Sequence, residues 1–199
     1  PEIGLAGMES TWVKNIRTWT SPCPEDDGIS LLSKTLKDIK KKFGRIGITL
    51  GQESHLRMPI SNFSSLIENI SPVEIVDFAL EMHSFKKIKS SAEIRKIQHI
   101  CEITSTAFEN LPNLIKTGET ERECCLKLRY DILKLGADNS PYMIAGSGLG
   151  GYDNIIMGPT DKVLEKGDVL IIDTGSTFDG YFCDFDRNFA FEKLSDETR

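Results

Sequence analysis

Apolar residues recur at helical spacing in the first part of the chain. Between residues 29 and 43 they stand three or four positions apart, at Ile29, Leu32, Leu36, Ile39 and Phe43. This spacing puts them on one face of a helix. Asp26 or Asp27 can cap its start, and Gly44 can end it. We therefore predict an amphipathic helix over residues 29–43.

Three shorter segments follow this helix. "RIGITL" (45–50) and "VEIVDF" (73–78) are predicted to be strands because they are short apolar runs rich in β-branched residues. "SNFSSLIEN" (61–69) between them is predicted to be a short helix. Alternation of strands and helices is typical of an α/β arrangement.

The pattern changes after residue 86. Ser90 with Glu93, and Thr120 with Glu123, match the S/T-x-x-E capping box that begins a helix. The first box precedes a long helix marked by Ile94, Ile97, Cys101, Phe108 and Leu111. The second precedes a helix that is expected to end at Gly136. Its inward-facing side chains are expected to be Leu128, Ile132 and Leu135.

The last sixty residues have a β texture. "PYMIAGS", "DVLIIDTGS" and "GYFCDFDRNFAF" are each predicted to be a strand. We predict an α/β (α+β) fold with a domain boundary near residue 86, which separates domains over residues 1–85 and 86–199.

Composition narrows the class of protein. Hydrophobic residues make up 39% and charged residues 27%, as in ordinary globular proteins. The net charge of -6 argues against a nucleic-acid partner, because phosphate neutralisation needs a basic surface. The sequence contains no apolar run of roughly 18 residues, so we expect no membrane span.

The cysteines and the chain ends add two expectations. Five cysteines without C-x-x-C spacing argue against a disulfide framework or a cysteine zinc site. We therefore expect a reducing compartment, the cytoplasm. The chain starts at Pro1 without a methionine and stops just after a strand-like segment, so we expect a fragment of a longer protein.

"GSGLGG" (146–151) satisfies the dinucleotide pattern G-x-G-x-x-G. A dinucleotide loop needs a helix directly afterwards, since the pyrophosphate binds at that helix's N-terminus. "YDNIIMGPTDK" follows instead and has no helical period. The segment is therefore interpreted as ordinary turns or as a flexible glycine loop at the rim of a site.

The segment "DTGSTFDGYFCDFD" (173–186) carries four aspartates. Asp179-Gly180 between two β-type runs is a strong signal for a hairpin with a type I′ turn. If these two residues form the loop, Asp173 faces Asp186. Asp184 then lies on the same face, diagonal to Asp173, with Cβ atoms roughly 7 Å apart.

Three carboxylates on one sheet face repel one another and raise each other's pKa unless a positive charge lies among them. Two divalent cations about 3.5–4 Å apart can be held by carboxylates at these separations. Arg187 points to the opposite face in this register. Aspartates that simply face solvent on a one-sided sheet fit the spacing equally well.

The letters DTGS also match the catalytic turn of an aspartic peptidase. That chemistry needs two carboxylates that share one proton, and D-T-G occurs once in this chain. A second copy of the chain, or sequence outside it, would have to supply the other half. This hypothesis ranks below the metal site.

"KSSAEIRKIQHICEI" together with "LEKGDVLIIDTGSTFDGYFCDFDRNFAF" resembles the creatinase, aminopeptidase P and prolidase family of M24-type metallopeptidases. The family has an Asp-x-Gly strand, a Gly-Tyr hairpin return and a second aspartate eleven positions after the first. Asp173, Tyr181 and Asp184 match these positions. The resemblance implies part of a creatinase-type N-terminal lobe, followed by the first half of a pita-bread catalytic domain.

The resemblance implies that Asp173 and Asp184 are the first two ligands of two divalent metal ions, with Asp184 bridging them. The ions would be manganese, cobalt, iron or zinc. The other ligands, a histidine and two glutamates, would lie beyond Arg199. No catalytic residue is therefore assigned in this fragment, which would be inactive alone, and a homodimer is expected for the full-length form.

The sequence departs from the family at two positions. Peptidase members have a histidine three residues before the proline of a "P-T-D"-like turn, where this chain has Ile156. The missing imidazole removes a proton carrier and puts cleavage of proline peptides in doubt. Asp186 stands where the family usually has threonine or serine. Asp186, Tyr181 and Ile156 are candidate site-lining residues, whereas His55, His83 and His99 are interpreted as ordinary surface or helix histidines.

Two functions from different classes remain open. The first is a dinuclear metal-dependent hydrolase that acts on an amide or related C–N bond of a peptide or small molecule. The second is a non-catalytic pita-bread module that binds a partner, as some members of this fold do. The aspartic-peptidase half is the third hypothesis.

Overall fold

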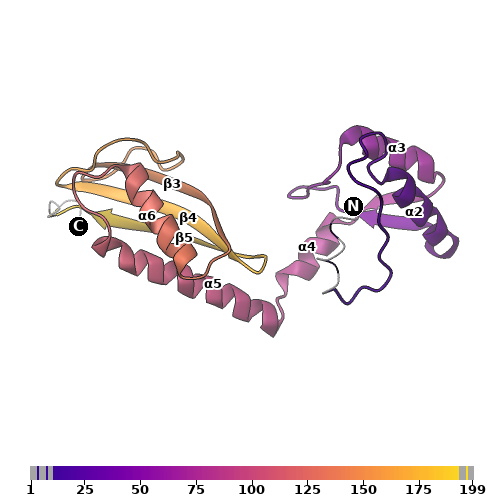
Figure 1. Ribbon diagram of the computed structural model, residues 1–199, viewed down its shortest axis with the longest axis horizontal. Helices are drawn as coiled ribbons and strands as arrows, with labels where there is room; N and C mark the ends of the chain where they lie inside the picture. The colour runs from indigo at the N-terminus through magenta and orange to yellow at the C-terminus, as the bar shows by residue number, and fades with distance from the viewer. Residues whose placement is uncertain (1–3, 5–7, 9–10, 193–195, 197–199) are drawn as a thin grey trace. The chain divides into compact units, whose positions relative to one another are not determined.

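The computed structural model describes residue 4, residue 8, residues 11–192 and residue 196, apart from the side chains of residues 39–43. The chain divides into two compact units, Pro1–Ile88 and Lys89–Arg199. The division follows directly after helix α4 (Ala79–Lys87), as Figure 1 shows.

The first unit contains the predicted α/β elements. Helix α2 (Ile29–Phe43) and strand β1 (Arg45–Ile48) are followed by helix α3 (Ile60–Ile70) and strand β2 (Glu74–Asp77), and the two strands pair in parallel. Asp26 accepts a hydrogen bond from the backbone N–H of Ser30 at 2.9 Å. Gly44 has a φ of 71°, which confirms its role at the helix end. Ile39 and Phe43 were also predicted to lie on the apolar face of α2, but their side chains are outside the part of the chain that the structure describes.

Helix α4 was not predicted. Of its residues only Ala79 is buried, while Leu80 and Phe85 are 78% and 79% exposed. Hydrophobic periodicity detects a helix through the apolar stripe that it buries. This helix buries no such stripe within its unit, so its sequence lacks the pattern.

The second unit begins with two helices and both predicted capping boxes. Helix α5 (Ser91–Asn110) is capped by Ser90 and Glu93, and helix α6 (Glu121–Lys134) by Thr120 and Glu123. A single 3-10 turn, η2 (Leu111–Asn113), follows α5. The prediction that Leu135 points inward was wrong, because this residue is the C-cap after the last turn and is 38% exposed.

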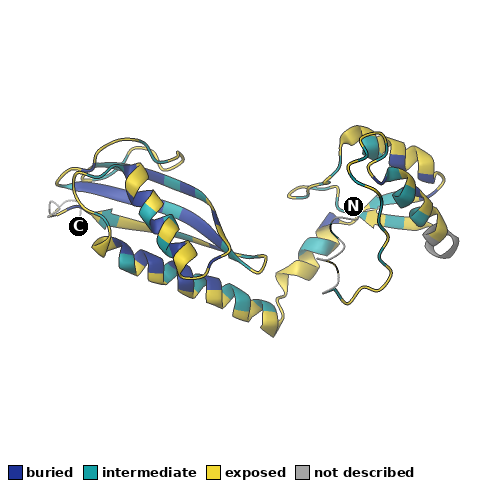
Figure 2. Ribbon diagram, in the orientation of Figure 1, coloured by how far each residue is buried: buried dark blue, intermediate teal, exposed yellow. Residues whose placement is uncertain are grey.

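Three strands follow in the second unit. Strands β3 (Asn139–Leu149), β4 (Asp168–Phe178) and β5 (Tyr181–Ala190) form an antiparallel sheet in the order β3-β4-β5. Helices α5 and α6 lie on one face of this sheet (Figure 1). Their buried side chains form one core with the strands, in which the fully buried members include Ile100, Leu128, Ile132, Ala145, Leu170 and Ile172. The buried colour in Figure 2 follows this helix–sheet interface.

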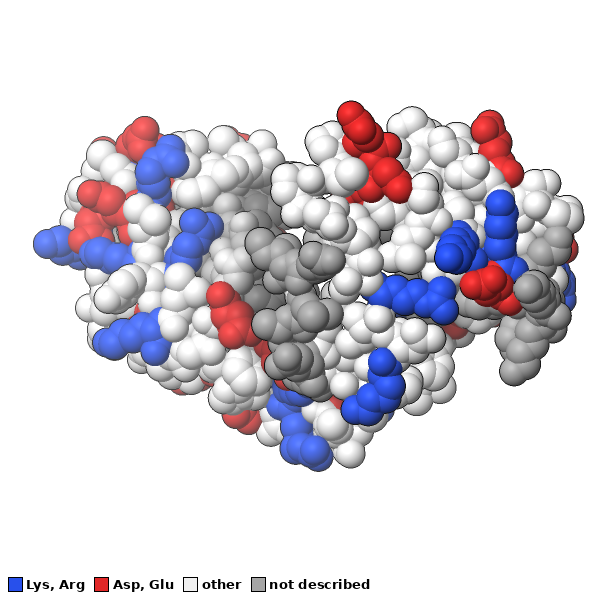
Figure 3. Space-filling model, turned by 45° about the vertical axis from the view of Figure 1, so that its right-hand side comes forward, with Lys and Arg blue, Asp and Glu red and all other residues white. Residues whose placement is uncertain are grey.

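The molecular surface carries charges of both signs. On the face shown in Figure 3, basic and acidic side chains are interspersed. The five cysteines are free thiols. Within the part of the chain that the structure describes, no helix is both long and apolar enough to cross a bilayer.

Candidate functional site

The β4–β5 hairpin has the predicted turn and register. Asp179 and Gly180 have φ angles of 47° and 78°, the positive values that a type I′ turn requires at both positions. Asp173 pairs with Asp186, and Gly175 pairs with Asp184. The geometric prediction for this ribbon is therefore confirmed.

The three aspartates share one face of the sheet, and helices α5 and α6 cover the other. Ile172 and Thr174, which flank Asp173 along β4, are both fully buried, and Ile172 belongs to the helix-covered core. Because successive side chains alternate between faces, Asp173 points away from that core. Asp173 is half-buried, whereas Asp184 and Asp186 are exposed.

Negative charge accumulates on this face without compensation. Burial raises the pKa of Asp173, and the charges of Asp184 and Asp186 raise it further. None of the ion pairs among the described residues involves these three carboxylates. Arg187 lies over the ring of Phe185 on the helix-covered side, with its guanidinium carbon 5.3 Å from the ring centroid.

These carboxylates suit a divalent cation in donor chemistry but supply only part of a coordination shell. Oxygen donors of this kind match hard and borderline divalent metals. A cation among them would also relieve the repulsion that raises the pKa of Asp173. Within the described residues, no group of three or more histidines, cysteines and acidic residues could hold an ion by itself.

Tyr142 is a fourth polar residue at this place, and no sequence pattern indicated it. It pairs with Gly175, which in turn pairs with Asp184, so the three residues form one row across β3, β4 and β5. The Tyr142 hydroxyl donates a hydrogen bond to Oδ1 of Asp184 at 2.5 Å. Burial raises the pKa of Tyr142, and the hydrogen bond to Asp184 raises it further.

Gly175 explains why the row can form. A Cβ atom at this position would lie 2.0 Å from Cζ of Phe182, closer than any real contact allows. The rings of Tyr142 and Phe182 come from the two neighbouring strands, with their centroids 6.3 Å apart. The glycine of the Asp-x-Gly motif therefore makes room for side chains that reach over β4.

Two of the three candidate site-lining residues lie elsewhere. Tyr181 is on the opposite face from Asp184, and its hydroxyl donates to Glu93 of α5 at 3.1 Å, with Lys96 over its ring. Ile156 is in the loop after β3 and is 80% exposed. Asp186 is brought together with Asp173, as predicted.

The three histidines lie in surroundings unrelated to the carboxylates. The ring of His99 packs edge-on against Phe178 at a centroid distance of 4.6 Å. Nε2 of His83 lies 3.3 Å from the carbonyl oxygen of Gln52 in the first unit. His55 is exposed in the first unit.

The glycine-rich segment shapes the loop that carries Ile156. No helix follows Gly151, in agreement with the rejection of a dinucleotide loop. A Cβ at Gly146 would lie 2.5 Å from the carbonyl oxygen of Asn154, and one at Gly148 would lie 2.4 Å from that of Gly151. Glycine therefore lets the loop fold back against β3, where Ala145 donates its N–H to Met157 at 3.1 Å.

A buried carboxylate fixes the far end of this loop, and no sequence pattern signals it beyond a glutamate in the first turn of α6. Glu121 is 3% exposed and accepts hydrogen bonds from the hydroxyl of Ser147 and from both the N–H and hydroxyl of Thr160. Lys162 completes the cluster by contacting Ser147 at 3.0 Å and Asp168 at 2.6 Å. Burial raises the pKa of Glu121, but these hydrogen bonds outweigh it and hold the pKa below its ordinary value.

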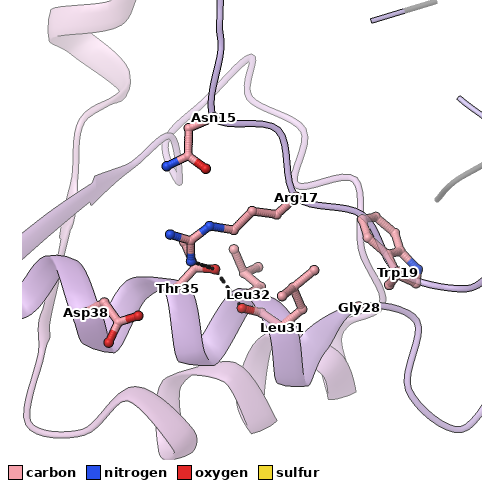
Figure 4. A pocket seen from close by; sticks show the side chains of 8 residues that line it. All are labelled: Asn15, Arg17, Trp19, Gly28, Leu31, Leu32, Thr35 and Asp38. Atoms are coloured by element: carbon pink, nitrogen blue, oxygen red, sulfur yellow. Dashed lines mark hydrogen bonds between the residues drawn. The ribbon is translucent and has the colours of Figure 1, made fainter. Parts of the chain in front are cut away.

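A cavity of about 520 Å³ lies in the first unit, whereas the carboxylates belong to the second. Figure 4 shows Arg17, Trp19 and Thr35 in its lining. Arg17 donates to Thr35 at 2.8 Å, and the indole of Trp19 donates to Asp27 at 2.9 Å. Two of its polar groups are thus paired within the unit, and we place the candidate site at the uncompensated carboxylates instead.

Comparison with known proteins gives a family match over the second unit. Residues 95–199 match the model of metallopeptidase family M24. An uncharacterized peptidase of Bacillus subtilis, YqhT, is 30% identical over 170 residues, which cover 84% of this chain and 47% of that protein. A Xaa-Pro dipeptidase of Pyrococcus horikoshii is 30% identical over 146 residues, or 71% of this chain and 40% of that protein.

A solved structure supports the same relationship. The X-Pro aminopeptidase of Thermotoga maritima superposes with a TM-score of 0.77 at 27% identity, over 98% of this chain and 51% of that chain. The mixed helix-and-strand architecture is thus that of the pita-bread M24 structures. The chain spans about half the length of the relatives that it matches.

Proposed function

This chain belongs to metallopeptidase family M24, and on that premise we propose that it forms part of a dinuclear metal-dependent hydrolase. The reaction would be hydrolysis of an amide or related C–N bond. The observation that carries the proposal is the uncompensated face on which Asp173, Asp184 and Asp186 gather on one β-ribbon.

In this proposal Asp173 and Asp184 supply carboxylate oxygens to two divalent cations, which are manganese, cobalt, iron or zinc. Such cations polarise a carbonyl group and lower the pKa of bound water. Asp173 contributes a carboxylate whose burial and crowding favour a positive neighbour. Asp186, directly opposite Asp173, adds negative charge at the edge of the site and is proposed as a site-lining residue.

The remaining parts of the site belong to the same proposal. A histidine and two glutamates, located after Arg199 in the full-length protein, would complete the ligands. Residues 1–199 would then be inactive alone. Residues 1–85 and 86–199 are proposed as a partial N-terminal lobe and the first half of the catalytic domain, in a cytoplasmic protein that forms a homodimer.

The substrate is proposed at the level of its reacting bond. Relatives named Xaa-Pro dipeptidase and X-Pro aminopeptidase favour a peptide with proline after the scissile bond. Ile156, exposed in the loop where a histidine is expected, offers neither a donor nor a proton carrier. A substrate that does not need that imidazole, whether a peptide or another small amide, therefore fits the chain better.

The metal assignment is tested by the metal content of the full-length protein. Asp184→Asn keeps the size of the side chain but removes its charge, so we expect loss of bound metal and of amide hydrolysis. Asp179→Asn is the matched control, because it removes a carboxylate from the same hairpin and retains a residue that tolerates the turn conformation. Equal metal content in Asp184→Asn and the unmodified protein would refute the assignment.

A non-catalytic binding module is the second candidate, and the replacement at Ile156 favours it. It predicts that the full-length protein hydrolyses no amide even when loaded with manganese or cobalt. The aspartic-peptidase half is disfavoured, because Asp173 lies inside the central strand β4 of a family M24 chain. It predicts contact between two copies of Asp173 in a symmetric dimer, which cross-linking of Asp173→Cys would detect.

A further inference from the structure

We infer that Tyr142 is a positioning residue for the carboxylate of Asp184. This inference rests on the proposed function, because it assumes that Asp184 is a metal ligand. It goes beyond the family pattern in naming a residue of β3 that acts on the ligand from two strands away.

The geometry of the row carries the inference. Neighbouring strands are about 4.8 Å apart, so Tyr142 and Asp184 are separated by about twice that distance at the backbone. A phenol side chain can span this gap only if the middle strand presents no side chain. Gly175 occupies that middle position, and the Tyr142 hydroxyl reaches Oδ1 of Asp184 at 2.5 Å.

The contact restricts a side chain that otherwise has little to hold it. Asp184 is exposed, and an exposed carboxylate without partners samples several rotamers. Within the described residues, the Tyr142 hydroxyl is the one hydrogen-bond donor that contacts this carboxylate. The hydroxyl therefore selects one orientation of the carboxylate before any ion arrives.

The hydrogen bond leaves the carboxylate able to bind a metal. An ionised carboxylate offers about four lone-pair sites on its two oxygens. Tyr142 uses one site on Oδ1, which leaves the second site of that oxygen and the whole of Oδ2. Groups that orient a ligand in this way change metal affinity by about 10- to 100-fold when they are removed.

The neighbouring aromatic ring supports the same role. Phe182 lies beside Tyr142 over Gly175, with an angle of 34° between the two rings. Tyr142 is half-buried in this position, whereas Phe182 is 47% exposed. Packing against Phe182 limits where the phenol can swing and keeps its hydroxyl at the carboxylate.

The test is the dissociation constant of Mn²⁺ from the full-length protein, measured by electron paramagnetic resonance of the free ion. Tyr142→Phe removes the hydroxyl alone and is expected to weaken binding by about 10- to 100-fold. Tyr181→Phe is the matched control, since it removes a hydroxyl that donates to a carboxylate on the opposite face of the same sheet. The control is expected to bind Mn²⁺ like the unmodified protein.

Thermal unfolding of the metal-free variants separates positioning from general damage to the fold. Unchanged Mn²⁺ affinity in Tyr142→Phe, together with lost binding in Asp184→Asn, would overturn the positioning role alone. Full Mn²⁺ binding by Asp184→Asn would overturn both the proposed function and this inference. Weakened binding in Tyr142→Phe with an unchanged unfolding midpoint would support the positioning role.

Discussion

The replacement Glu121→Gln is expected to loosen the loop that follows β3 while leaving the first unit unchanged. Glu121 sits in the first turn of α6 and is almost completely buried. Its two oxygens accept three hydrogen bonds at 2.6, 2.9 and 2.7 Å, one from Ser147 and two from Thr160. Glutamine has the same shape but carries one acceptor oxygen and no charge.

The cost can be worked from these three contacts. Hydrogen bonds to a charged group contribute about 1.5–3 kcal/mol each, against about 0.5–1.5 for neutral pairs. If glutamine turns its oxygen toward Thr160, its amide faces Ser147, so all three bonds become neutral and that to Ser147 reverses direction. Three weakened bonds cost about 3 kcal/mol of folding free energy. Glutamine is neutral and avoids the desolvation penalty of a buried charge, which offsets part of this loss. We expect a net loss of about 2 kcal/mol.

The assay is hydrogen exchange of the full-length protein, followed by mass spectrometry. Peptides from α6 and from residues 160–168 should exchange faster in Glu121→Gln. Peptides from the first unit, such as those from helices α2 and α3, should exchange at the same rate in both proteins and serve as the internal control. Glu109→Gln, an exposed replacement on α5, should alter stability by less than about 0.5 kcal/mol.

The effect should also depend on pH. Because hydrogen bonding holds the pKa of Glu121 below its ordinary value of 4.5, its contribution is fully present above that value. The contribution is lost as the pH falls through the lowered pKa, so the difference between the two proteins should shrink in acid. A pH-independent difference, or faster exchange in the first unit as well, would refute the reasoning.

Two further replacements test the open face of the sheet. Gly175→Ala should destabilise the second unit by about 1–3 kcal/mol, because its methyl group overlaps the ring of Phe182. Urea unfolding measures this loss, and adding Phe182→Ala should recover part of it if the overlap is the cause. Asp186→Asn should stabilise the metal-free protein by less than about 1 kcal/mol, since it removes the carboxylate that faces Asp173. The gain should fall as salt is added, and a gain that is insensitive to salt would exclude charge repulsion as its source.

Local sequence determined most elements of the fold. Both capping boxes formed as predicted because their hydrogen bonds join residues three positions apart. The Asp179-Gly180 turn likewise set the register of β4 and β5, because a two-residue loop leaves one way to pair the flanking strands. The gathering of Asp173, Asp184 and Asp186 on one face followed from this register alone.

Tertiary structure decided the rest of the site. Tyr142 reaches Asp184 because of the register in which β3 pairs with β4. That register shifts between Asn139 and Tyr142, and no local sequence pattern indicates the shift. The hairpin register directs Tyr181 to the face opposite Asp184, but only the packing of α5 brings Glu93, 88 positions away, to accept a hydrogen bond from its hydroxyl. Hydrogen bonds within a turn are fixed by neighbouring dihedral angles. Contacts between β3, β5 and α5 depend on how whole elements pack, and that information is spread over the entire core.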